Sequence, residues 1–153
     1  MDKSKFKHKT EVRVRNYEVD WQGIVHNAVY LLYFEVGRIE YFKTIGMTIN
    51  RESILNQERI VLVRNEIDYK ASAPFDDVLT IYTRMARIGN SSFVMEGIIE
   101  RSTTGEEIAR NFAFHVWLDP VTGKSRTIPD SFRRSVQEKE GSHCAIEWPS
   151  IEV

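Results

Sequence analysis

The first regular feature of the chain is an alternation of polar and apolar positions near its N-terminus. Between Thr10 and Tyr17, Val12 and Val14 alternate with charged side chains. A period of two is typical of a strand that buries one face. A polar stretch then leads to Gly23, whose freedom to adopt positive φ fits a turn. The pattern therefore predicts a strand over residues 10–17 that is followed by a turn.

The next segment, residues 27–45, is apolar at almost every position. Its charged residues are Glu35, Arg38, Glu40 and Lys43. A helix that is apolar around most of its circumference is expected to be buried, and Gly46 stands where a C-terminal cap belongs. Gly37 lies inside this helix, at a cost of about 1 kcal/mol relative to alanine. We therefore expect the helix to approach another backbone closely at Gly37.

The second half of the chain changes from helical to strand-like patterning. Four runs rich in β-branched and aromatic residues predict strands over residues 59–69, 77–88, 92–101 and 107–118. Short breaks that contain glycine or asparagine favour antiparallel hairpins between them. A short polar helix is expected over residues 130–138, and a loosely attached tail over residues 141–153.

The order of elements predicts the fold class. One buried helix needs a partner that surrounds it, and a curved antiparallel sheet can do so. We therefore expect a single α+β domain over residues 1–153, with the sheet wrapped around the long helix. Such a sheet leaves an edge or a face open, which favours a homodimer.

Composition and charge narrow the function. The 153 residues carry a net charge of −1, which argues against a nucleic-acid partner. No apolar stretch approaches the roughly 20 residues of a membrane span, and no signal peptide is apparent. The single cysteine, Cys144, excludes an internal disulfide and fits a reducing compartment. We expect a cytoplasmic protein without a membrane partner.

Metal and cofactor motifs are not apparent either. The four histidines, His8, His26, His115 and His143, do not pair at the spacing of metal ligands. The chain has no glycine-rich phosphate loop and no nucleophile elbow. We therefore expect neither a metal nor a cofactor.

One stretch combines residues suited to acyl-transfer chemistry. Asp20 lies just before the predicted N-terminus of the helix, where backbone N–H groups are unpaired and carry partial positive charge. Those groups can polarise a carbonyl, and Asp20 can serve as a general base or as a nucleophile. Alternatively, Asp20 caps the turn and His26 or Asn27 caps the helix. Spacing alone favours this second interpretation.

The sequence around these residues resembles a known family. The signature comprises Asp20-x-x-Gly23-Ile24-Val25-His26-Asn27-x-x-Tyr30, followed by Tyr33-Phe34-Glu35 and Arg38. It is similar to that of hotdog-fold acyl-CoA thioesterases of the 4-hydroxybenzoyl-CoA thioesterase family. Later segments fit the same family in order, so that the resemblance covers about residues 9–135 and implies hydrolysis of an acyl thioester.

The resemblance implies roles for individual residues. The catalytic carboxylate falls on Asp20, and the N–H that polarises the carbonyl falls on Asn27; His26 either orients the site or caps the helix. The family's active site lies at a dimer interface. The resemblance also implies that two sheets join edge to edge and that two such dimers often pack together, so we expect a homodimer or a homotetramer. The chain has Glu18-x-Asp20 where many members have two aspartates. Its His26-Asn27 pair looks more like acyl-carrier-protein thioesterases of the same fold, which leaves coenzyme A or a carrier protein open as the acyl carrier.

Other residues are candidates for substrate binding or for the core. Tyr30 is a candidate for lining the acyl channel, and Lys70 and Arg87 are candidates for contacting the phosphates of coenzyme A, although packing or solvent exposure is their more common role. Arg38, if buried, needs a charged partner, for which Glu35 is available. His115 is expected in the core.

Two other functions remain open at this point. A hotdog dehydratase or hydratase would carry an Asn-Pro between its aspartate and histidine. The five residues between Asp20 and His26 contain no such pair. A non-catalytic acyl-thioester binder is less consistent with a carboxylate at Asp20.

Overall fold

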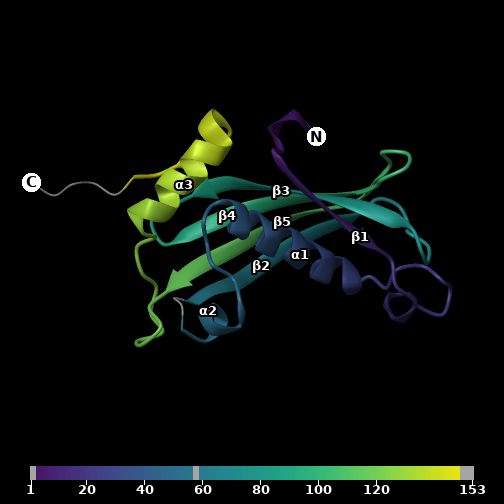
Figure 1. The fold of residues 1–153 in the computed structure, drawn as a ribbon, viewed down its shortest axis with the longest axis horizontal. Coiled ribbons are helices and arrows are strands. Elements are labelled where there is room, and N and C mark those ends of the chain that lie inside the picture. Colours follow the sequence, from purple (N-terminus) through teal and green to yellow (C-terminus); the bar gives the residue numbers. More distant parts are fainter. Residues whose placement is uncertain (1–2, 57–58, 149–153) are drawn as a thin grey trace, which may run out of the picture.

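The fold consists of one sheet with a long helix lying across one of its faces (Figure 1). A computed structural model describes residues 3–56 and 59–148. Its strands are β1 (His8–Arg13), β2 (Arg59–Tyr69), β3 (Val78–Ile88), β4 (Ser92–Arg101), β5 (Glu107–Leu118) and β6 (Ala145–Ile146). They are arranged in the order β1-β3-β4-β5-β2 with antiparallel neighbours, and β6 runs parallel to β3. The predicted α+β class is confirmed.

Three α-helices complete the described structure, together with three short 3-10 turns. The α-helices are α1 (Val29–Thr44), α2 (Arg51–Asn56) and α3 (Asp130–Glu140). The 3-10 turns cover Lys3–Lys5, Asn16–Glu18 and Gly141–His143. The sequence predicted β2, β4 and β5 with their observed bounds, β3 within one residue, and α1 and α3 within two. It did not predict α2.

The first strand is shorter and lies earlier than predicted. Residues 10–17 were expected to be extended, but β1 ends at Arg13, which pairs with Val78 at the start of β3. Beyond that point the chain turns, because the Arg15 N–H donates to Glu18 Oε1 at 2.7 Å and closes a 3-10 turn. Alternation alone could not place this end, because it depends on where the neighbouring strand begins.

The C-terminal segment is attached to the sheet, so the expectation of a loose tail from residue 141 is wrong for the residues described. Cys144 is buried, β6 pairs with β3, and the Glu147 N–H donates to the Ile88 carbonyl at 2.8 Å. Arg133 in α3 is fully buried and donates to the carbonyls of Asn90 and Glu147. Residues 149–153 lie outside the described part of the chain.

Helix α1 packs against β3 and β4 at two glycines. A Cβ atom on Gly37 would lie 2.5 Å from Thr83 Oγ1 and 2.7 Å from Ile81 Cγ2. The helix thus approaches β3 closely at Gly37, but the neighbouring atoms belong to side chains and not, as expected, to another backbone. Gly97 of β4 leaves similar room for the Phe34 ring. The predicted cap at Gly46 is confirmed, with φ at +85°.

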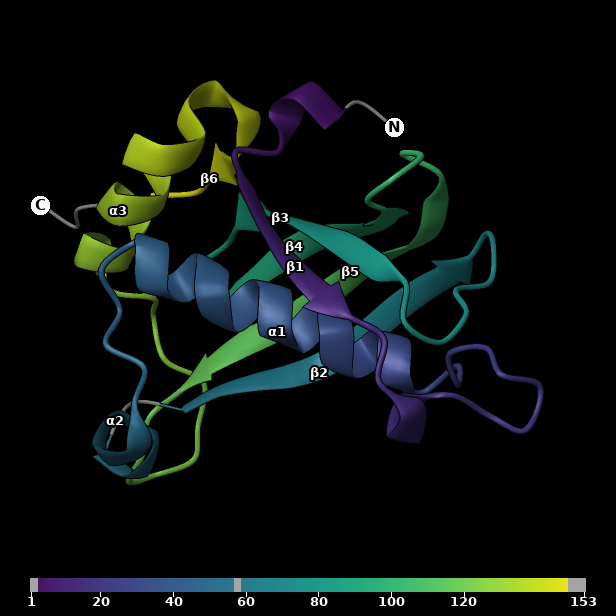
Figure 2. The ribbon, with the colours of Figure 1, turned by 45° about the vertical axis from the view of Figure 1, so that its right-hand side comes forward.

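The sheet covers only part of α1 in a single chain. Figure 2 shows α1 lying over one face of the sheet, with β2 at the edge. Tyr41 and Phe34 are buried, whereas Leu32 is 57% exposed and Val36 is 40% exposed. The expectation that α1 is buried on most sides is therefore wrong for one chain, because no element of the described chain covers this second face.

Candidate active site

The loop before α1 folds into a tight hairpin that carries Asp20. Val19 and Val25 form an antiparallel bridge, and the Asp20 N–H donates to the Ile24 carbonyl at 2.8 Å. Gly23 adopts a φ of +78° and donates its N–H to the Asp20 carbonyl at 3.0 Å. The hairpin brings Asp20 beside the segment that leads into α1.

The two carboxylate oxygens of Asp20 differ in their hydrogen bonding. Its Oδ1 accepts a hydrogen bond of 2.7 Å from the Gln22 N–H, as an aspartate in a turn commonly does. Its Oδ2 has no hydrogen-bond partner among the described residues, and the residue is partly exposed. The carboxylate is thus held by one oxygen while the other is available for chemistry.

The backbone N–H groups at the entrance to α1 differ in whether they have a hydrogen-bond acceptor. The His26 N–H donates to the Glu18 carbonyl at 3.0 Å, and the Val29 N–H donates to the His26 carbonyl at 2.9 Å. The Ala28 N–H donates to His26 Nδ1 at 3.1 Å. Within the described part of the chain, the Asn27 N–H has no acceptor. An unpaired N–H at a helix start can donate a hydrogen bond to a carbonyl oxygen and so polarise the carbonyl.

His26 therefore has a defined ring orientation. Because Nδ1 accepts the Ala28 N–H, the neutral ring carries its proton on Nε2. The residue is exposed, so Nε2 remains available to a bound molecule. The contact gives the Ala28 N–H an acceptor, but Ala28 is itself the N-cap residue of α1 and has no side-chain capping hydrogen bond. The interpretation that His26 or Asn27 caps the helix is therefore not confirmed.

Tyr69 joins the site although no pattern in the sequence indicated it. It is the last residue of β2, and its hydroxyl donates to the Asn27 carbonyl at 3.0 Å. Its ring meets that of Tyr30 edge-on at 5.7 Å. Only a prediction of where β2 ends relative to α1 could have found this contact.

Tyr30, a candidate for the acyl channel, lies beneath this site in the core. It is 4% exposed and packs edge-on against Tyr33 at 6.1 Å. Burial raises the pKa of the Tyr30 hydroxyl. In a single chain Tyr30 is thus a buried packing residue next to the site.

Glu18 holds the loop to α1. Its Oε1 accepts hydrogen bonds from the Tyr33 hydroxyl at 3.0 Å and from the Arg15 N–H at 2.7 Å. Burial and the Glu18 hydrogen bond raise the pKa of the Tyr33 hydroxyl. The glutamate that replaces an aspartate in the family pattern therefore has an anchoring role in this chain.

The two basic candidates lie at opposite ends of the sheet. Lys70 directly follows Tyr69 and is exposed at the same end as Asn27. Arg87 pairs with Ala145 at the far end of β3, and the nine steps from Val78 amount to about 30 Å. The structure thus brings Lys70 near Asn27, and a single chain does not bring Arg87 there.

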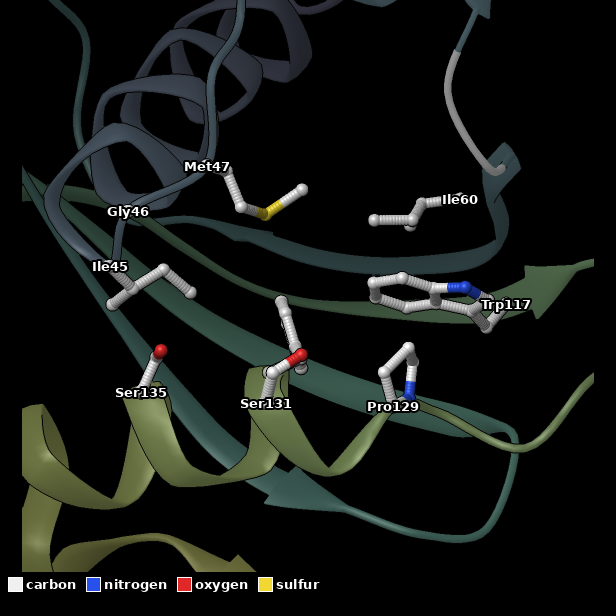
Figure 3. Close-up of a pocket in the computed structure, with 9 residues that line it drawn as sticks. Ile45, Gly46, Met47, Ile60, Trp117, Pro129, Ser131 and Ser135 are labelled. Atoms are coloured by element: carbon white, nitrogen blue, oxygen red, sulfur yellow. The ribbon is translucent and has the colours of Figure 1, made fainter.

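Two cavities follow α1 away from Asn27. The first has a volume of about 390 Å³ and lies between α1 and strands β2 and β5; Leu31, Arg38 and His115 are among the residues that line it. The second has a volume of about 380 Å³ and is lined in part by Ile60 and Trp117. Figure 3 shows Ile60 above the Trp117 ring in this second cavity, with α3 forming the opposite wall. Ile60 lines both cavities, so they adjoin.

Arg38 and His115 are both buried at the first cavity. Burial lowers the pKa of Arg38, and Glu35 opposes this electrostatically, but the expected ion pair with Glu35 is not formed among the described residues. His115 is in the core as expected and stacks on Phe93 with ring centroids 4.7 Å apart.

The described residues contain no group of three or more His, Cys, Asp or Glu side chains that is arranged to hold a metal ion. In the same part of the chain, none of the helices has the length and apolar character needed to cross a membrane.

Comparison with known proteins identifies the family. The model of the thioesterase-like superfamily matches residues 14–136. A thioesterase from Thermus thermophilus, solved in complex with coenzyme A and zinc, is 30% identical with a TM-score of 0.77. The similarity covers 89% of this chain and 96% of that one.

Two curated relatives differ in their acyl carrier. The acyl-CoA thioesterase YbgC of Haemophilus influenzae is 31% identical over 94 residues, which are 60% of this chain and 68% of the relative. The chloroplastic acyl-acyl carrier protein thioesterase ATL3 of Arabidopsis thaliana is 30% identical over 128 residues, which are 82% of this chain and 65% of the relative. The chain belongs to the thioesterase-like superfamily, and its architecture is the hotdog fold that the sequence resemblance implied.

Proposed function

We propose that this protein hydrolyses acyl-CoA thioesters to a free acid and coenzyme A. The observation that carries the proposal is the unpaired Asn27 N–H at the entrance to α1, beside a hairpin whose Asp20 has one carboxylate oxygen free. The relatives named above as acyl-CoA thioesterase and as a thioesterase bound to coenzyme A support this substrate.

In the proposed mechanism, the thioester carbonyl oxygen accepts a hydrogen bond from the Asn27 N–H. This interaction strengthens as negative charge develops on the oxygen, and it lowers the barrier to attack at the carbonyl carbon. The Asp20 carboxylate either activates a water molecule that attacks the carbonyl carbon, or attacks that carbon itself to form a mixed anhydride, which water then hydrolyses to the free acid. On both routes the bond from the carbonyl carbon to sulfur breaks and the thiolate of coenzyme A leaves. His26 helps to orient the bound thioester through Nε2.

Substrate binding is proposed to use Lys70 for the phosphates, because it lies at the same end of the sheet as Asn27. Arg87 can contribute only if a second chain brings it to this end. The partner proposed here is therefore a second copy of the chain, in a homodimer or a homotetramer.

Two open surfaces support this assembly. Strand β2 pairs with β5 on one side only, and Leu62 and Val63 on it are 47% and 60% exposed. Leu32 and Val36 on α1 are also exposed. Pairing two β2 edges would satisfy the backbone groups of both strands and bury apolar side chains, which an isolated edge leaves in water.

A carrier-protein thioester is the second candidate substrate. The similarity to the Arabidopsis acyl-carrier-protein thioesterase extends over more of this chain than the similarity to YbgC does. A cytoplasmic location also remains our proposal, supported by a single cysteine that is free and buried.

Release of free thiol from a panel of acyl-CoA and acyl-carrier-protein thioesters tests the proposal. We expect hydrolysis of acyl-CoA by the wild-type protein and a large loss in the Asp20→Asn variant at an unchanged melting temperature. Binding without thiol release would favour a non-catalytic binder. Hydration of an enoyl thioester without hydrolysis would favour a hydratase.

A further inference from the structure

The cavity between α1 and β2 contains two polar side chains with unused hydrogen-bonding groups. Arg38 is 8% exposed and His115 is 5% exposed, and both line this cavity. Among the described residues, Arg38 Nη1 and His115 Nδ1 are buried without a hydrogen-bond partner. A buried polar group that stays unsatisfied is costly. Two such groups at one cavity indicate that something else supplies their partner.

Most other residues around the cavity cannot supply it. Leu31, Ile39 and Leu62 contribute apolar walls. The Asn65 Oδ1 atom accepts a hydrogen bond of 2.9 Å from Asn111 and forms none with Arg38 among the described residues. Glu35 lines the cavity but is exposed and forms no ion pair with Arg38 among the described residues.

The two groups complement each other chemically. Burial and the Arg38 guanidinium lower the pKa of His115 to about 4, so that its ring is neutral at neutral pH. Arg38 Nη1 and His115 Nδ1 are themselves covered, so an acyl group in the cavity would meet these side chains at their remaining nitrogens. Those nitrogens form no side-chain hydrogen bond among the described residues, so that the guanidinium offers a charged donor and the neutral imidazole offers Nε2. An oxygen that accepts from Arg38 and also carries a hydrogen for the His115 lone pair would satisfy both.

The position of Arg38 along α1 determines how far an acyl group must extend from Asn27 to contact it. Arg38 follows Asn27 by eleven residues, which corresponds to about 16 Å along a helix. Side chains on a helix lean toward its N-terminus, which shortens this span. A thioester whose carbonyl lies at the Asn27 N–H would therefore reach Arg38 with a remote part of a medium-length acyl group.

We propose that Arg38 and His115 are specificity-determining residues that select acyl groups bearing a hydroxyl far from the thioester. The proposal rests on the proposed thioesterase function. A plain alkyl chain would leave both polar groups unpaired, which a site built for hydrogen bonding disfavours. A carboxylate would satisfy Arg38 but would share the cavity with Glu35, and like charges repel.

Three coenzyme A thioesters of equal chain length test the proposal: decanoyl-CoA, ω-hydroxydecanoyl-CoA and the mono-CoA thioester of decanedioic acid. For the wild-type protein, kcat/KM should be at least about tenfold higher for the hydroxy compound than for decanoyl-CoA, since one hydrogen bond to a charged donor accounts for a factor of about 10 to 100. The dicarboxylic compound should not exceed the hydroxy compound. A preference for the dicarboxylic compound would overturn the choice of a neutral oxygen.

Matched variants assign the preference to these residues. Arg38→Met and His115→Phe should each reduce the preference for the hydroxy compound about tenfold or more, while kcat/KM for decanoyl-CoA is retained or rises. His115→Phe keeps a ring to stack on Phe93. Arg134→Met, at an exposed position on α3, is the control and should keep the wild-type preference.

Binding of free ω-hydroxydecanoic acid, measured by calorimetry, gives a readout that does not require hydrolysis. The acid should bind to the wild-type protein at least about tenfold more tightly than decanoic acid, which has the same carboxylate and no hydroxyl, and this difference should be lost in either variant. Equal rates for decanoyl and hydroxydecanoyl thioesters would overturn the proposal and leave the thioesterase function intact, whereas hydrolysis of neither would contradict the function itself. If Arg38→Met instead changes the mass in light scattering and leaves selectivity unchanged, a second copy of the chain partners Arg38 and the proposal is wrong. If Arg38→Met fails to fold, His115→Phe provides the test through the ratio of kcat/KM for ω-hydroxydecanoyl-CoA to kcat/KM for decanoyl-CoA.

Discussion

The Tyr69 hydroxyl donates a hydrogen bond of 3.0 Å to the carbonyl oxygen of Asn27. This contact ties the last residue of β2 to the backbone at the entrance of α1. Because the Asn27 N–H is the group proposed to polarise the substrate carbonyl, Tyr69 acts as a positioning residue for it. The hydrogen bond therefore fixes the backbone at Asn27 relative to the end of the edge strand β2.

Tyr69→Phe should reduce kcat while leaving KM and the melting temperature nearly unchanged. Loss of one hydrogen bond typically costs about 0.5–1.5 kcal/mol, which corresponds to a factor of about 2 to 10 in rate if it falls on the transition state. Steady-state thiol release measures the effect. Tyr82→Phe, on β3, is the control and should keep the wild-type kcat; an equal loss in both variants would contradict the positioning role.

Asp20→Asn should lower hydrolysis by a factor of about 10² or more, because general-base catalysis typically contributes 10²–10⁴. Asparagine can still accept the Gln22 N–H through its side-chain oxygen, so the turn and the melting temperature should be preserved. Turnover and thermal unfolding should be measured on the same preparation. A folded variant with wild-type turnover would show that Asp20 only caps the turn, and His26 would then be the next residue to test.

Val63→Glu should convert the proposed dimer into a monomer. Val63 is 60% exposed on the open β2 strand, and a carboxylate there would oppose pairing with a second β2 strand. Light scattering should give half the mass, and activity should fall at least about tenfold if the site needs both copies, as a misassembled site commonly does. Val121→Glu, 91% exposed in the loop after β5, should keep the mass and the activity. Unchanged mass in Val63→Glu would remove β2 from the interface.

Acid should destabilise the protein through His115. Its pKa is lowered to about 4 in the folded protein by burial and by Arg38, against 6.5 as its ordinary value. Between these values the unfolded chain binds more protons, so the stability contributed by the neutral ring is complete above about pH 6.5 and is lost as the pH falls toward 4. The shift corresponds to a loss of about 3 kcal/mol in the free energy of unfolding.

Urea unfolding at about pH 7 and about pH 4.5 measures this loss. His115→Phe should show a smaller decrease between the two pH values than the wild-type protein does. His8, whose pKa is also lowered to about 4 by burial and by Lys139, should still contribute in that variant. An identical pH dependence in both proteins would mean that His115 is not held neutral.

The sequence by itself determined the order and the bounds of most elements. Strands β4 and β5 were predicted with their observed ends because turn residues that strands disfavour stand close to both ends of each run, and β2 was predicted from its run of β-branched residues. The apolar run, with Gly46 after it, likewise defined α1 within two residues. Gly37 predicted a close contact, since glycine inside a helix is costly without one. The motif from Asp20 to Tyr30 predicted the family.

Only the tertiary structure decided which residues meet. Strand alternation gave the wrong end for β1, because that end depends on pairing with β3. The short β6 was not predicted because it has no periodicity of its own. The contact from Tyr69 to Asn27 and the separation of Arg87 from both depend on how the sheet places residues that lie far apart in sequence. Local patterns record what each segment prefers. That Arg38 Nη1 and His115 Nδ1 have no hydrogen-bond partner among the described residues follows from how α1 and β5 come together, which no local pattern contains.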